Sequence, residues 1–154
     1  MQARIVFGSV LTIVVLAGAA VLSGCGSAAT TSAASCKQQY KAWQSGPAQN
    51  ATKLFTTAQE NLSAAGSTEN LQAIKDAVQK EGTAAANLAA FPVPACADPH
   101  GDLAALLDQV RAAATNVAAA NGLTALVQAM KPLNNVPTLE SAFTTEVKQT
   151  TGIS

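Results

Sequence analysis

The only histidine of the chain lies between two aspartates, in the order Asp98, His100 and Asp102. One imidazole and two carboxylates form a donor set that could hold a metal ion. A helix start explains the same residues more simply: Asp98 can cap a helix, Pro99 suits its first position, and Asp102 is favourable in its first turn. We therefore expect His100 to belong to a helix start that holds no metal, no cofactor and no catalytic residue.

Other signs of catalytic chemistry are missing from the sequence. GxSxG, GxGxxG, HExxH and Walker-type motifs do not occur. Because the chain has a single histidine, a catalytic triad would have no second candidate for its base. The acidic residues stand at helical spacings that are typical of solvated helix faces. This group comprises Glu60, Glu69, Asp76, Glu81, Asp102, Asp108, Glu140 and Glu146. We expect a protein that is not an enzyme.

The first of three cysteines, Cys25, follows an apolar run at the start of the chain. Arg4 precedes this run, and residues 5–21 carry no charge, which is the pattern of an export signal. The run ends in Leu-Ser-Gly-Cys at residues 22–25, which resembles the lipobox of bacterial lipoproteins. The resemblance implies removal of residues 1–24 and a diacylglycerol anchor on Cys25. An uncleaved anchor helix is the alternative.

The other two cysteines, Cys36 and Cys96, are then left to pair with each other. Export favours a disulfide, because disulfides persist in oxidising compartments. A helical hairpin between them would return the chain to its starting level and bring both cysteines to the same end. Two free thiols, with Cys96 reactive beside His100, are the alternative.

Helical periodicity predicts the elements that must position these residues. Apolar side chains recur at intervals of three and four, and proline or glycine interrupts each run. The expected helices cover about 36–44, 47–65, 67–90, 98–121, 123–131 and 136–152. Gly66 and Gly152 are expected to end helices, and Ser67 to cap the third. These segments predict an all-α fold, a compact antiparallel bundle of about four to six helices after the N-terminal signal segment.

The predicted helices and their connections contain few aromatic residues. Tyr40 and Trp43 lie three residues apart, shortly after residue 35, and have polar groups suited to an interface. Phe55, Phe91 and Phe143 could together line an apolar pocket, although filling the core is the simpler role for such residues. Leu54, Leu71, Leu123 and Val127 fall within the apolar runs.

The 154 residues allow one folded domain, which we place at residues 36–154. The preceding residues 25–35, rich in Ser, Thr and Ala, are expected to form a flexible tether behind the lipidated cysteine. The chain has no net charge and only 12% charged residues, which argues against a nucleic-acid partner.

The whole chain resembles small Ala-rich lipoproteins of actinobacteria. The resemblance rests on the LSGC lipobox, on CKQQYKAWQSGPA at residues 36–48 and on FPVPACADP at residues 91–99. It implies a protein of the cell envelope, lipid-anchored to the membrane and facing the extracytoplasmic side. We expect a non-enzymatic protein that presents a helical surface to an envelope protein partner. A carrier that binds an apolar small molecule or lipid between its helices is the alternative.

Overall fold

The computed structural model describes residues 32–68 and 70–153. These residues form α-helices and one short 3₁₀ helix, with no strand among them, which confirms the all-α bundle. The elements are α1 (Ala33–Ser45), α2 (Ala48–Gly66), α3 (Leu71–Ala89), α4 (Asp102–Ala119), α5 (Gly122–Ala129), the 3₁₀ helix η1 (Lys131–Asn135) and α6 (Val136–Thr151). No helix in this part of the chain is both long and apolar enough to cross a membrane.

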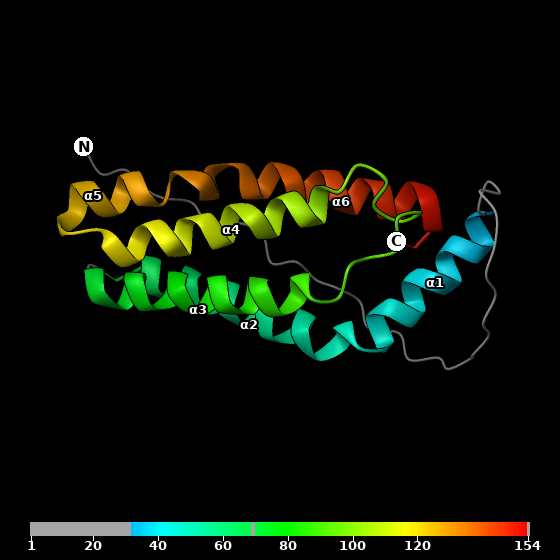
Figure 1. The fold of residues 1–154 in the computed structure, drawn as a ribbon, viewed down its shortest axis with the longest axis horizontal. Helices are drawn as coiled ribbons and strands as arrows, with labels where there is room; N and C mark the ends of the chain where they lie inside the picture. The colour runs from blue at the N-terminus through cyan, green and yellow to red at the C-terminus, as the bar shows by residue number, and fades with distance from the viewer. Residues whose placement is uncertain (1–31, 69, 154) are drawn as a thin grey trace.

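The long helices lie side by side in an antiparallel bundle (Figure 1). The α2–α3 hairpin packs against α4 mainly through α3, and α6 runs back along α4 after α5 and η1. The bundle is elongated, with α5 at one end and α1 at the other (Figure 1). The opposite ends of the molecule therefore carry different elements.

The first helix begins earlier than the sequence predicts. The Ser32 hydroxyl accepts a hydrogen bond from the Ser35 backbone N–H at 3.3 Å, so Ser32 caps α1 and the helix begins at Ala33. Residues 33–35, expected as tether, are therefore helical. The expected signal peptide at residues 1–24 and the lipidation site Cys25 lie outside the described residues.

The turn between α2 and α3 also differs from the prediction. Gly66 is the last helical residue of α2 rather than a left-handed stop, and Asn70, not Ser67, caps α3. The Asn70 side-chain oxygen accepts hydrogen bonds from the backbone N–H groups of Gln72 and Ala73, at 3.0 and 3.1 Å. The Ser67 hydroxyl instead donates to the Ser63 carbonyl within α2. Gly152, by contrast, ends α6 as predicted, and it does so in the left-handed conformation, with φ of 64°.

The predicted disulfide is present. Cys36 of α1 and Cys96 of the α3–α4 loop are bonded, with their Cα atoms 5.8 Å apart and a separation of 60 residues in sequence. The α2–α3 hairpin returns the chain to the level of α1, as the spacing predicts. The bond therefore ties the loop that precedes α4 to the first helix.

Tyr40 and Trp43 belong to the core, so their expected role at an interface is wrong. They are only 4% and 8% exposed, their rings stack with centroids 5.6 Å apart, and Tyr40 meets Phe143 edge-on. The polar group of Trp43 is satisfied inside the protein, because its indole N–H donates to the Phe91 carbonyl at 2.8 Å. Burial, together with the negative charge of Asp98, raises the pKa of Tyr40 to about 12.

Helices α3 and α4 pack closely together at Gly82. A Cβ atom added to Gly82 would lie 2.2 Å from the Cβ of Ala114, so only glycine fits there. The neighbouring Glu81 is 3% exposed, and its Oε2 atom has no hydrogen-bond partner among the described residues. The prediction that Glu81 lies on a solvated face is therefore wrong, and its burial raises its pKa to about 7.

Four large apolar residues that the sequence placed in apolar runs are exposed instead. These are Leu54, Leu71, Leu123 and Val127, with exposed fractions of 56%, 36%, 61% and 51%. The apolar stripes of α2, α3 and α5 are thus wider than the surfaces that neighbouring helices cover. The predicted stripe of α4 is buried at Leu103, Leu106, Leu107, Val110 and Val117 and partly buried at Ala114.

Candidate functional site

The residues at the start of α4 position the candidate site. This helix begins later in the chain than the sequence predicts. Asp98 was expected to cap a helix that begins at Pro99, but α4 begins at Asp102. Gly101 precedes it in the left-handed conformation, with φ of 74°, which most side chains disfavour. The buried Asp98 carboxylate reaches past this turn and accepts hydrogen bonds from the backbone N–H groups of Asp102 and Leu103, at 2.7 and 3.1 Å.

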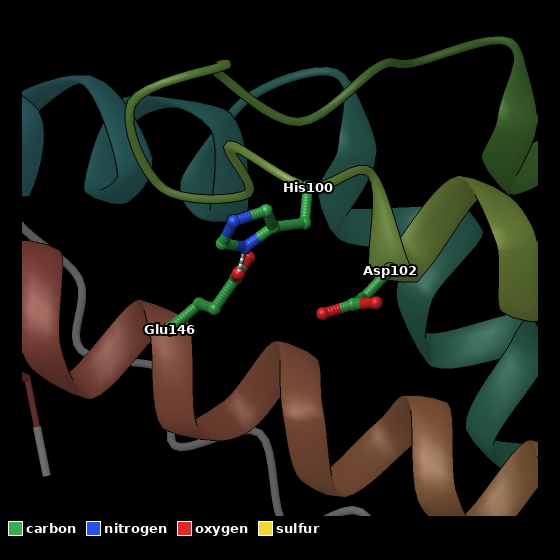
Figure 2. Close-up of side chains that lie close together, drawn as sticks. All are labelled: His100, Asp102 and Glu146. Carbon is green, nitrogen blue, oxygen red and sulfur yellow. Dashed lines mark hydrogen bonds and ion pairs between the residues drawn. The ribbon is translucent and has the colours of Figure 1, made fainter.

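The later start leaves His100 in the turn rather than in the helix. Its side chain is 77% exposed and forms an ion-pair contact with Glu146 of α6, Nδ1 to Oε1. Figure 2 shows that Glu146 points up from α6 toward the imidazole, while Asp102 lies beside the pair at the first residue of α4. One donor atom from each of the three side chains lies within 4.8 Å of the others.

The three side chains border a shallow, solvent-open depression between the turn and α6. Its other lining residues come from one face of α6: Pro137, Thr138, Ser141, Ala142 and Thr145. Their spacing of three and four residues puts them on one side of the helix, next to Glu146. The site is therefore a surface pocket with α6 as its floor.

Glu146 is the most buried member of the group. Its side chain is 12% exposed, and its Oε2 atom has no hydrogen-bond partner among the described residues. The contact with His100 uses only Oε1. One buried carboxylate oxygen thus faces no donor, and leaving such an atom unpaired is unfavourable.

Sequence reasoning identified only part of this group. It associated Asp98 with His100 and Asp102, whereas Asp98 turns inward to bond the helix start and Glu146 takes its place. One signal could have singled out Glu146, which precedes the buried Val147 and follows the buried Phe143 by three residues. An acidic residue at the border of a buried helix face is more enclosed than one in the middle of the solvent-exposed face.

The three phenylalanines that could line an apolar pocket belong to one core cluster. Phe55 and Phe143 are 1% and 5% exposed, and the partly buried Phe91 packs against the same cluster. Their burial agrees with the simpler role, which is to fill the core. A ligand cavity among them stays a prediction.

Comparison with known proteins gave no match, either to a protein-family model, to a curated protein sequence or to a solved structure. The function must therefore be inferred from the residues of this chain and their geometry. Two features stand out in the described residues: the His100, Asp102 and Glu146 cluster at one side of the bundle, and the exposed apolar face of α5 at one end.

Proposed function

We propose that this protein is a non-enzymatic lipoprotein of the cell envelope, anchored through lipid on Cys25, that presents the α5 end of its bundle to a protein partner. The LSGC sequence at residues 22–25 supports the anchor, because it offers a thiol after two small residues at the end of an uncharged apolar run. Two or more acyl chains hold a protein stably at a bilayer.

The position of α1 supports the orientation. Because α1 begins at Ala33, seven residues (26–32) separate it from Cys25. Even fully extended, seven residues reach at most about 25 Å. The α1 end of the bundle would then lie close to the membrane, and α5, at the opposite end, would point away from it (Figure 1).

The observation that carries the proposal is the exposed face of α5. Leu123 and Val127 are 61% and 51% exposed and lie four residues apart, so they share one side of the helix. The helix is only eight residues long, and its inner side is buried through Leu126 and Ala129. Exposed apolar side chains gathered on one helix are typical of a surface that a partner covers.

Lipidation is tested first, with Cys25→Ser. A hydroxyl is a far weaker nucleophile than a thiolate, so the variant should lose its diacylglycerol group and leave the detergent phase in partitioning. Equal partitioning of the variant and the wild type would show that an ordinary membrane helix holds the protein, and would contradict the lipid anchor.

The partner surface is tested by site-specific photocrosslinking in intact envelopes. A photoreactive amino acid at position 123 should give an adduct of defined mass, and Val127→Ser should abolish it. The matched control is position 54 on α2, where Leu54 is exposed to a similar extent, 56% against 61% for Leu123. Equal adducts at both positions, or none at 123, would contradict the proposal. A small apolar molecule retained in native mass spectra would support the carrier alternative instead.

A further inference from the structure

We propose that His100, Asp102 and Glu146 form a binding site for one divalent transition-metal ion, with Zn²⁺ as the best fit. The three residues come from the turn before α4, the first residue of α4 and the last half of α6. Their donor atoms, one imidazole nitrogen and two carboxylate oxygens, lie within 4.8 Å of one another. A single ion placed among them would contact all three after small side-chain rotations.

The chemistry of the donors selects the class of metal. Zn²⁺ binds imidazole nitrogen and carboxylate oxygen at about 2.0–2.2 Å and accepts three protein ligands with water in the fourth position. Ca²⁺ takes about six to eight oxygen ligands, and Mg²⁺ prefers an octahedral shell rich in water. A set of three donors that includes a nitrogen, at the edge of an open depression, therefore favours Zn²⁺ over both.

The local charges also favour a cation. Asp102 and Glu146 bring two negative charges when ionised, which a divalent ion would neutralise. The N-terminus of α4 opposes the ion, but its dipole amounts to only about half a positive charge. The attraction of two carboxylates therefore outweighs the opposing dipole.

An independent observation points to a missing ligand at this position. Glu146 has one buried oxygen, Oε2, without a partner among the described residues. A simple ion pair of His100 with Glu146 would use Oε1 alone. A metal ion would be bound by the imidazole, the Asp102 carboxylate and the buried carboxylate of Glu146 together.

Two features hold the ligands in place. The Asp98 carboxylate bonds the backbone N–H of Asp102 and so orients the first turn of α4. The Cys36–Cys96 disulfide fastens the loop to α1 four residues before His100. Such supporting contacts orient the residues that bind a metal directly. Asp98 is thus a positioning residue for this site.

The test is titration of the full chain in detergent with Zn²⁺ by isothermal calorimetry, after treatment with a chelator. In protein made without the lipid, Cys25→Ser removes a free thiol that would otherwise compete for the metal. We expect saturable binding of one Zn²⁺ per chain, accompanied by proton release. His100→Ala and Glu146→Gln should each weaken binding at least about tenfold, since even the loss of a supporting contact costs about 10–100-fold.

Glu140→Gln is the matched control, because it makes the same change on the same helix outside the depression. It should bind Zn²⁺ like the parent protein. Thermal unfolding shows whether each variant is still folded. Zn²⁺ should raise the Tm of the parent and of Glu140→Gln. It should not raise the Tm of His100→Ala, whose altered side chain is exposed.

Three outcomes would overturn the proposal. The first is the absence of saturable Zn²⁺ binding by the parent protein. The second is unchanged affinity in His100→Ala, which would place the metal elsewhere. The third is displacement of Zn²⁺ by Mg²⁺ or Ca²⁺ at equal concentration, which would indicate a carboxylate surface without a role for the imidazole.

Discussion

Replacement of Glu81 by glutamine should stabilise the protein in a way that depends on pH. Glu81 lies on α3 beside Gly82, where α3 and α4 pack closely together, and it is 3% exposed. Burial disfavours the charged carboxylate and raises its pKa from 4.5 to about 7. Glutamine keeps the size and polarity of the protonated side chain but cannot ionise, so it isolates the effect of the charge.

The sign and size of the effect follow from the two pKa values. The folded protein binds the proton more tightly than the unfolded chain, so the stabilising contribution is complete below pH 4.5 and is lost as pH rises to about 7. At about 1.4 kcal/mol for a tenfold change in affinity, the loss amounts to about 3 kcal/mol. Glu81→Gln should therefore match the wild type near pH 4 and exceed it by up to about 3 kcal/mol near pH 8.

Urea unfolding followed by far-UV circular dichroism, with the disulfide intact, measures this difference at each pH. Glu60→Gln makes the same change at an exposed position of α2 and should leave the difference near zero throughout. A Glu81→Gln effect that is the same at both pH values, or a wild type that gains relative stability as pH rises, would refute the burial of an ionisable Glu81.

Three further changes test the packing of the bundle. Gly82→Ala should lower the free energy of unfolding by about 1–3 kcal/mol in urea titrations, because the new Cβ would lie 2.2 Å from that of Ala114; the added change Ala114→Gly should restore most of the loss, and failure of this rescue would refute the close contact. Reduction of the Cys36–Cys96 bond should cost about 4 kcal/mol and clearly lower the Tm seen by calorimetry, whereas an unchanged Tm would contradict a stabilising bond. Trp43→Phe should destabilise by about 1–3 kcal/mol in the same titrations, because a buried carbonyl loses its indole donor; a neutral result would mean that water replaces the donor.

The sequence was a good guide wherever the physical cause is local. The spacing of Leu103, Leu106, Leu107 and Val110 predicts the buried face of α4, and the structure buries all of them. The two prolines at residues 92 and 94 cannot continue a helix, and α3 ends just before them. Parity of the cysteines and the hairpin between them predicted the disulfide, which is confirmed.

Helix ends were less predictable, because several nearby side chains compete to cap the same backbone groups. Ser67 and Asn70 are both good capping residues, and only the path of the turn decides that Asn70 reaches the start of α3. In the same way Asp98 bonds the start of α4 from four residues before it, across a turn that Gly101 makes possible. That displacement of the helix start is what frees His100 to meet α6.

The sequence by itself determined the helical class and the order of the helices, since these depend on periodicity and helix breakers. It predicted the pairing of Cys36 with Cys96 only on the premise that Cys25 carries lipid. Only the tertiary structure decided that Glu146 lies beside His100 and that Glu81 is buried. Both outcomes depend on which helices meet and how closely. A period of 3.6 residues shows which side of a helix is apolar, but the neighbour that covers that side, and the distance at which Gly82 lets it approach, are set by the packing of the whole bundle.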